Sequence, residues 1–346
     1  MTEETYRAAV LYGPEDLRHK DLDVPAPGPE EVLVQVKACA LCGSDVSAYF
    51  GRHPRITFPR IMGHEYAGVV WRKGERVSGW ENGQRVCCDC DLPCRECDLC
   101  RQGRRNLCLR LKTQGFDTDG AYAELVRVPE RNLHLLPERV SFEEASMVQT
   151  LAVAYNGVKR RGEVKVQDRV LIFGCGAIGL CALAVAKASG AQVFMVDTIE
   201  YRLEKALAMG ADRVFNGTQG NFIEAVLEAT RGKGVDKVIE AVGGSQDVTL
   251  SQATQVVKRA GLIVVIGTFS LNKATLRMAE FKDREMDLRG ARGYVDAFPD
   301  CLELIASGKI NLKPLITHRL PLAEVEKGLL LMRDKSEKVM KVIISP

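Results

Sequence analysis

The sequence lacks the features that mark secreted, membrane-spanning and nucleic-acid-binding proteins. Its N-terminus, MTEETYRAAV, is acidic and polar and has no apolar signal-peptide core. The longest apolar runs have the length of a strand, far short of the roughly 20 residues that span a bilayer. The formal net charge is only +3, and no basic run alternates with aromatic residues. We therefore expect a cytoplasmic protein that binds neither membrane nor nucleic acid.

The chain also lacks repeats and low-complexity segments, and its 346 residues are enough for two ordinary domains. Up to about residue 150, short β-branched runs are punctuated by Gly and Pro, which is typical of a β-rich domain. From about residue 165, apolar strands alternate with helical stretches, which predicts βαβ units around a parallel sheet. The strands are expected at 169–173, 192–196, 213–215, 235–240 and 262–267, with helices at 201–209, 222–230 and 247–257.

Cysteine, in contrast, is plentiful, with 12 residues in the chain. Four of them follow the pattern C-x2-C-x2-C-x7-C, which should occur by chance on the order of 10^-3 times in such a chain. Four clustered sulfurs suit a tetrahedral Zn2+ with every position filled, which is a structural site. Disulfides would need an oxidising compartment, which nothing here indicates, and an iron–sulfur cluster is a competing interpretation. The four residues are Cys94, Cys97, Cys100 and Cys108.

A glycine-rich turn follows the strand at 169–173. The glycines Gly174, Gly176 and Gly179 form G-x-G-x-x-G, a pattern expected by chance about 0.25 times per chain and therefore weak alone. Here it leads from a strand into a helix, and Asp197 ends the next strand, as a dinucleotide-binding fingerprint requires. A carboxylate at Asp197 would bind a ribose diol and repel a 2′-phosphate, which favours NAD over NADP. Arg202 could help to bind a 2′-phosphate, although its position in the next helix favours a solvent-facing side chain.

A second group of metal-ligand types lies upstream. Cys42 is followed 22 residues later by His64 and then Glu65. A thiolate, an imidazole and a carboxylate can hold Zn2+ and leave a fourth position open, as a catalytic site needs. The competing interpretation is a core thiol and a hydrogen-bonded core histidine.

Taken together, these three groups of residues resemble the zinc-containing medium-chain alcohol and polyol dehydrogenases, in the sorbitol-dehydrogenase-like branch. Further stretches match in order over nearly the whole chain. They are GHEYAGVV at 63–70, 115–124, VIEAVG at 238–243 and KSEKVMKVII at 335–344.

The resemblance implies an α/β protein with a GroES-like β-barrel catalytic domain and a Rossmann doubly wound domain. The catalytic domain would comprise residues 1–152 and 293–346, with a structural zinc lobe at 87–110, and the NAD-binding domain residues 153–292. It implies that Cys42, His64 and Glu65 hold a second, catalytic zinc and that Ser44 accepts the alcohol proton. It also assigns Ala177, Ile178, Val242 and Gly267 to the cofactor site.

Two positions depart from the family pattern. Ser47 stands where polyol dehydrogenases commonly have the histidine that ends the proton relay, and a hydroxyl cannot store a proton as imidazole can. Gln149 stands near the metal where the family has glutamate or a zinc-binding cysteine. His53 is a conceivable substitute for the relay histidine, although its basic flanks indicate an exposed loop.

The expected reaction is hydride transfer between NAD and a secondary alcohol of a polyol, sugar derivative or cyclitol. The basic loop at 52–60 could instead meet an anionic substrate, although a solvated loop is the simpler interpretation. Alternatives are a threonine or simple-alcohol dehydrogenase, or a non-catalytic NAD- and zinc-binding homologue. The resemblance also suggests a homodimer or homotetramer, with contacts near the Rossmann edge strand and 287–294.

Overall fold

A computed structural model describes residues 4–244, 246–269, 273–335 and 337–346. The chain forms two compact units. Unit 1 comprises Met1–Gln149, Phe298–Gly308 and Leu312–Pro346, and unit 2 comprises Thr150–Ala297 and Lys309–Asn311. Unit 1 therefore combines both ends of the chain, and unit 2 comes almost wholly from the middle.

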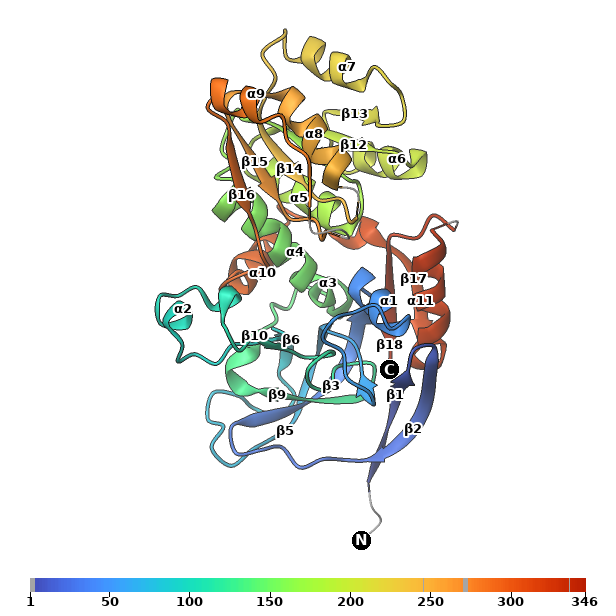
Figure 1. Cartoon of the computed structure of the whole chain (residues 1–346). Helices are drawn as coiled ribbons and strands as arrows, with labels where there is room; N and C mark the ends of the chain where they lie inside the picture. The colour runs from blue at the N-terminus through green and yellow to red at the C-terminus, as the bar shows by residue number, and fades with distance from the viewer. Residues whose placement is uncertain (1–3, 245, 270–272, 336) are drawn as a thin grey trace. The chain divides into compact units, whose positions relative to one another are not determined.

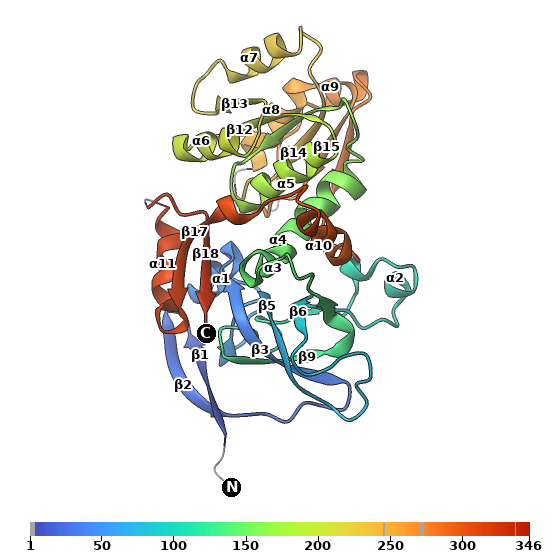
Figure 2. The same cartoon turned by 180° about the vertical axis from the view of Figure 1, so that it is seen from behind.

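The main sheet of unit 1 is arranged around β3 (Glu31–Ala40), which pairs antiparallel with β5 (Glu65–Lys73), β9 (Leu125–Pro129) and β18 (Lys341–Ser345). Figure 2 shows β18 and β17 (red) at one end of unit 1, with α11 packed beside them. Seven of the ten residues of β3 are apolar and buried, all except Glu31, Gln35 and Lys37, so the strand lies in the core of the unit. The other strands of unit 1 are β1 (Thr5–Gly13), β2 (Asp16–Asp23), β4 (Arg60–Ile61), β6 (Arg85–Cys88), β7 (Asp91–Leu92), β8 (Lys112–Thr113), β10 (Leu133–Leu135) and β17 (Ile316–Pro321).

Short helices connect these strands. The β1/β2 hairpin and most of these helices carry weak sequence signals, and we did not predict them. The α-helices are α1 (Gly43–Tyr49), α2 (Asp98–Arg101), α3 (Phe142–Ser146), α10 (Phe298–Ala306) and α11 (Val325–Asp334). The 3-10 helices span Arg105–Leu107, Glu130–Asn132, Lys313–Leu315 and Leu322–Glu324.

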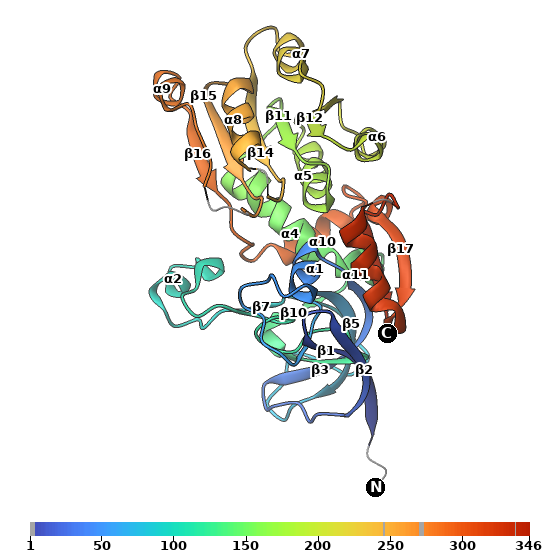
Figure 3. The ribbon, with the colours of Figure 1, turned by 45° about the vertical axis from the view of Figure 1, so that its right-hand side comes forward.

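Unit 2 contains a six-stranded parallel sheet in the order β13-β12-β11-β14-β15-β16. This is the doubly wound order 3-2-1-4-5-6, so the predicted Rossmann fold is confirmed. The strands fan out side by side in Figure 3, and Figure 1 shows helices α5 to α9 around them. The strands are β11 (Arg169–Phe173), β12 (Gln192–Asp197), β13 (Arg213–Asn216), β14 (Val235–Glu240), β15 (Val257–Val265) and β16 (Asp287–Gly290). The helices are α4 (Val148–Tyr155), which starts in unit 1, the π-helix Asn156–Arg161, α5 (Ala177–Ala188), α6 (Glu200–Ala208), α7 (Phe222–Ala229), α8 (Gln246–Val256) and α9 (Met278–Asp283).

The strand order places a switch point between β11 and β14, whose chain connections leave in opposite directions. Ligands of open α/β sheets bind at such a point, beyond the carboxyl ends of the strands. Strands β11 and β14 have the predicted limits, whereas β15 begins at Val257, five residues before the predicted 262–267. It follows α8 directly, and an irregularity in its pairing with β14 near Val235 accommodates the extra residues.

Candidate active site

Long-range strand pairing brings the three predicted catalytic-zinc ligands together. In the β3/β5 ladder Ala40 faces Glu65, so the residues that follow β3 and those that begin β5 meet. Cys42 precedes α1, and His64 lies just before β5. One ligand atom from each of Cys42, His64 and Glu65 lies within 4.8 Å of the others. His64 and Glu65 are buried and Cys42 is half-buried. A thiolate, an imidazole and a carboxylate at this spacing are a suitable donor set for Zn2+.

Asp45 orients this group, and the sequence analysis overlooked it. Its Oδ1 lies 3.2 Å from His64 Nδ1, and its Oδ2 accepts the Cys42 amide N–H at 2.9 Å. Burial alone raises the pKa of Asp45, but His64 and the Cys42 amide outweigh this, so the pKa lies below its ordinary value. An ionised Asp45 places the proton on Nδ1 of His64 and leaves Nε2 for a metal. The sequence signal that could have identified Asp45 was its position three residues after the candidate ligand Cys42, in the first turn of a helix.

Lys341 is a second neighbour that the sequence did not reveal. It lies on β18 with 2% of its surface exposed, and its ammonium group forms an ion pair with Glu65. The same group donates a hydrogen bond to the Leu41 carbonyl at 3.1 Å. Because a carboxylate has two oxygens, Glu65 can bind the Lys341 ammonium group and a metal ion at the same time. The C-terminal strand therefore contributes a buried positive charge to the candidate metal site.

Phe116 forms one wall beside His64. Its ring lies 5.0 Å from the His64 ring and stacks on His53 at 4.0 Å. The loop that carries Phe116 packs tightly, because a side chain at Gly120 would come within 2.2 Å of the Gly63 carbonyl. His53 is half-buried rather than fully exposed, and burial followed by the charge of Arg55 lowers its pKa.

The two serines and the glutamine lie in unit 1. Ser44 is half-buried in the first turn of α1. Ser47, one turn later, donates its hydroxyl to the Gly43 carbonyl at 3.2 Å, so it is tied back onto its own helix. Gln149 is the second residue of α4 and is half-buried.

Two arginines of the basic loop are paired with aspartates. Arg55 contacts Asp117 at 2.8 Å, and Arg60 contacts Asp119 at 2.9 Å. Arg52 is exposed, with its guanidinium 5.6 Å from the Phe50 ring. Pairing removes most of the positive charge that an anionic substrate would need from this loop.

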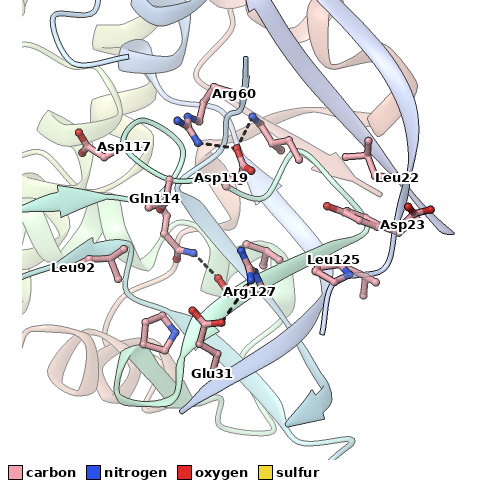
Figure 4. Close-up of a pocket in the computed structure, with 17 residues that line it drawn as sticks. Leu22, Asp23, Glu31, Arg60, Leu92, Gln114, Asp117, Asp119, Leu125 and Arg127 are labelled. Carbon is pink, nitrogen blue, oxygen red and sulfur yellow. Dashed lines mark hydrogen bonds and ion pairs between the residues drawn. The ribbon is translucent and has the colours of Figure 1, made fainter. Parts of the chain in front are cut away.

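Arg60 instead lines a separate cavity of about 470 Å³ in unit 1. Figure 4 shows its pair with Asp119 and a second pair between Arg127 and Glu31 on the cavity wall. The cavity-lining residues, all within the described ranges, do not include Cys42, His64 or Glu65. The cavity is therefore distinct from the candidate metal site.

The four-cysteine lobe converges as a set. Ligand atoms of Cys94, Cys97, Cys100 and Cys108 lie within 4.8 Å of one another. Main-chain N–H groups point at these sulfurs, as in the 3.2 Å contact from the Cys94 amide to Cys108 Sγ. The amides of Glu96 and then Cys97 lower the pKa of Cys94 to about 6, which favours a thiolate. The cysteines are all free, and sulfur separations of 3.4 and 4.0 Å exceed a disulfide bond of about 2.05 Å. Four such sulfurs suit a closed structural zinc site.

The glycine-rich turn of unit 2 has the shape its sequence predicts. Gly174 has a φ of +93°, and a side chain at Gly179 would come within 1.8 Å of the Gly174 carbonyl. Gly176 caps α5, with Ala177 and Ile178 half-buried behind it. The nearest atom to a side chain at Gly176 would be Arg202 Nη1 at 4.0 Å, which leaves room for a phosphate to approach the backbone.

Asp197 ends β12 beside this turn. Its carboxylate accepts N–H groups from Cys175 at 2.6 Å and from Thr198 at 2.8 Å. The expected solvent-facing Arg202 is instead half-buried, with Nη1 4.0 Å from the position of a side chain at Gly176. A carboxylate and a guanidinium therefore flank the position expected for a ribose. Val242 and Gly267 follow the neighbouring strands β14 and β15, at the same edge of the sheet.

Two sequence families match the chain. The alcohol dehydrogenase GroES-like domain matches residues 28–138, and the zinc-binding dehydrogenase family matches residues 177–307. The chain is 35% identical to L-idonate 5-dehydrogenase of Vitis vinifera, over 91% of this chain and 88% of the relative. It is 30% identical to sorbitol dehydrogenase of Bacillus subtilis, over 99% of this chain and 98% of the relative.

Solved structures agree with this assignment. A zinc-binding dehydrogenase from Sinorhizobium meliloti bound to NADP has a TM-score of 0.93 at 28% identity, covering 99% of this chain and 100% of the other. An alcohol dehydrogenase (rspB) from Escherichia coli complexed with NADH has a TM-score of 0.92 at 29% identity, covering 99% of each chain.

The fold and the matches define an oxidoreductase of the medium-chain type, built from a GroES-like domain and a Rossmann domain. The chain belongs to the zinc-binding alcohol dehydrogenase family, whose members act on CH–OH groups. Within the described ranges, no helix is both long and apolar enough to span a membrane.

Proposed function

We propose that this chain is a zinc- and NAD-dependent dehydrogenase that interconverts a secondary alcohol and a ketone on a polyol, sugar derivative or cyclitol. The observation that carries the proposal is the convergence of Cys42, His64 and Glu65, three ligand types from two distant segments of the chain, in one largely buried group. We also assign residues 1–152 and 293–346 to the catalytic domain and residues 153–292 to the NAD-binding domain. The names of the relatives, which include a sorbitol and an L-idonate dehydrogenase, favour this substrate class.

Each residue of the site has a definable task in that reaction. Cys42, His64 and Glu65 would hold the catalytic zinc, and the four-cysteine lobe would hold a structural zinc. A zinc ion at the open site supplies Lewis acidity, which makes an alkoxide accessible near neutral pH. Asp45 fixes the tautomer and direction of His64, and Lys341 holds Glu65 in place. Ser44 would accept the alcohol proton, while Ser47 bonds within its own helix.

The cofactor assignment rests on unit 2. The turn from Gly174 to Gly179 offers main-chain N–H groups and a helix N-terminus to a pyrophosphate. Asp197 favours the ribose diol of NAD, whereas Arg202 could attract the 2′-phosphate of NADP. Solved relatives contain either cofactor, so we assign NAD on the strength of the Asp197 carboxylate.

The direct test is a panel of polyols, sugar acids, cyclitols, amino alcohols and simple alcohols, each with NAD and with NADP, in zinc-replete protein. Formation of reduced nicotinamide with a polyol or cyclitol supports the proposal, and a preference for threonine or a simple alcohol would replace it. No reduction with any member of the panel would contradict dehydrogenase activity.

Metal analysis adds a second test. We expect two zinc ions per chain, and Cys42→Ser should lose one zinc and most of the rate while still binding NAD. The matched control is Cys181→Ser, because Cys181 is buried in α5 outside both cysteine groups. A Cys42→Ser variant with full zinc and full rate would refute the catalytic zinc.

A further inference from the structure

Glu240 is a buried carboxyl group at the cofactor edge of unit 2. It ends β14, one of the two strands at the switch point, and none of its surface is exposed. In the sheet it pairs with Phe173 of β11 and Val265 of β15. Neither the metal sites nor the glycine-rich turn explains an acidic side chain at this depth.

The Glu240 carboxyl binds the loop that follows its own strand. Its Oε1 accepts the Val242 amide N–H at 3.1 Å and the Thr249 hydroxyl of α8 at 3.0 Å. Its Oε2 is buried without a hydrogen-bond partner in the described part of the chain. One oxygen therefore holds the loop, while burial of the other makes the charged form costly.

The same residue also holds the loop that follows β15. The Glu240 carbonyl accepts the N–H groups of Ile266 at 2.8 Å and Gly267 at 3.1 Å. A side chain at Gly267 would lie 2.5 Å from Glu240 Oε2 and 2.1 Å from the Val242 carbonyl, so the two loops pack in close contact. Val242 and Gly267 are the residues of these loops that we assign to the cofactor.

Gln246 completes the connection between the two loops. Its side-chain amide donates to the Val242 carbonyl and, at 3.2 Å, to the Thr268 carbonyl. The Gly244 amide N–H reaches the same Thr268 carbonyl at 3.0 Å. Hydrogen bonds from Glu240, Gln246 and Gly244 therefore connect the two loops.

We propose that Glu240 is a positioning residue for the dinucleotide, and that its ionisation tightens the hold on the two loops and so strengthens cofactor binding. The proposal rests on the assignment of NAD to this edge of the sheet. An ionised oxygen accepts stronger hydrogen bonds than a neutral carboxyl, so the Val242 amide and the Thr249 hydroxyl are held more firmly.

The titration of Glu240 falls in an accessible pH range. Burial raises its pKa to about 7, against the opposing effects of Thr249, the amides of Val242 and Gly267, and Gln246. The side chains that face it are uncharged: Thr249 and Gln246 from α8, Phe173 from β11 and Val265 from β15. A pH-dependent change in NAD affinity with a midpoint near pH 7 would therefore be assigned to Glu240.

The test measures the Kd of NAD by titration calorimetry on the zinc-loaded full chain between pH 6 and 8.5. We expect the native protein to bind NAD at least about fivefold more tightly at pH 8.5 than at pH 6. A factor of about five is the lower end of the usual coupling between two sites. Glu240→Gln should bind NAD with a Kd that is nearly independent of pH. A Glu240→Gln variant with the native Kd at every pH would overturn the proposal.

Thr249→Val provides a second variant that keeps the carboxyl group. Because the Thr249 hydroxyl lowers the pKa of Glu240, its loss should move the midpoint of the affinity change to higher pH. Thr254→Val is the matched control, since Thr254 is buried on the same helix and bonds to Ser251. If Glu240→Gln does not fold, an unmoved midpoint in Thr249→Val overturns the proposal. Native protein that binds neither NAD nor NADP would refute the proposed function instead.

Discussion

At the scale of single residues, buried neighbours hold the candidate zinc ligands in place. Asp45 is fully buried and contacts both His64 and the Cys42 amide. In Asp45→Asn the charge that fixes the His64 tautomer is lost, although the side chain keeps its size. We expect zinc affinity at this site or turnover to fall about 10- to 100-fold, the usual cost of losing such a partner.

Zinc content after dialysis against a graded chelator, together with kcat/KM, measures this change. Asp16→Asn on the exposed β1/β2 hairpin is the control for loss of one carboxylate. An Asp45→Asn variant that keeps its second zinc and its rate would show that His64 needs no such support.

Glu240 also predicts how stability changes with pH. Its folded pKa of about 7 lies above the ordinary 4.5. The unfolded chain ionises first, so this group lowers stability as pH rises from about 4.5 to 7, by up to about 3 kcal/mol. Glu240→Gln lacks this loss. The free energy of unfolding of the variant minus that of the native protein should therefore be larger at pH 8 than at pH 5.

Urea unfolding of the two proteins at both pH values measures the difference in unfolding free energy. The exposed Glu204→Gln on α6 is the matched control and should show no such trend. Equal differences at the two pH values would mean that Glu240 titrates normally in the folded chain.

At the scale of elements, the proposed function assigns the cofactor preference to the turn between β11 and α5 and to the end of β12. In that proposal the Asp197 carboxylate would repel a 2′-phosphate, while Arg202 lies near the same turn. In Asp197→Ser the repulsion is removed and the guanidinium remains, so the ratio of kcat/KM for NADP over NAD should rise at least about tenfold. The double variant with Arg202→Ala should lose most of that gain. An unchanged ratio in Asp197→Ser would move the ribose site away from this carboxylate.

Local patterns predicted the elements whose signals lie within a few neighbouring residues. The limits of β11 and β14 and the glycine turn followed from apolar runs and spacing alone. The cysteine lobe was equally readable, because its ligands lie within one short segment. Arg202 was expected to face solvent and is instead half-buried. Its position in the helix does not determine the direction of a long, flexible side chain.

The residues of the site that the sequence did not predict depend on contacts between distant segments. Lys341 reaches Glu65 from the C-terminal strand, and only the β18/β3 pairing places it there. Glu240 belongs to a stretch that resembled the family, but its burial comes from β11, β15 and α8 together. Hydrophobic periodicity reports which face of an element is buried, and it carries no information on which buried polar groups meet.

At the scale of the whole molecule, the two units should respond to different ligands. The candidate zinc sites lie in unit 1 and the proposed dinucleotide-binding turn lies in unit 2, so each ligand should suppress local opening where it binds. Hydrogen–deuterium exchange of the full chain can separate the two responses. Chelation should speed exchange at 42–49, 64–73 and 94–108, and restored zinc should reverse it. NAD should slow exchange at 174–179, 241–244 and 266–268. Chelation without effect on 42–49 would contradict the catalytic site, and NAD without effect on unit 2 would contradict the cofactor site, so one experiment tests each half of the proposal separately.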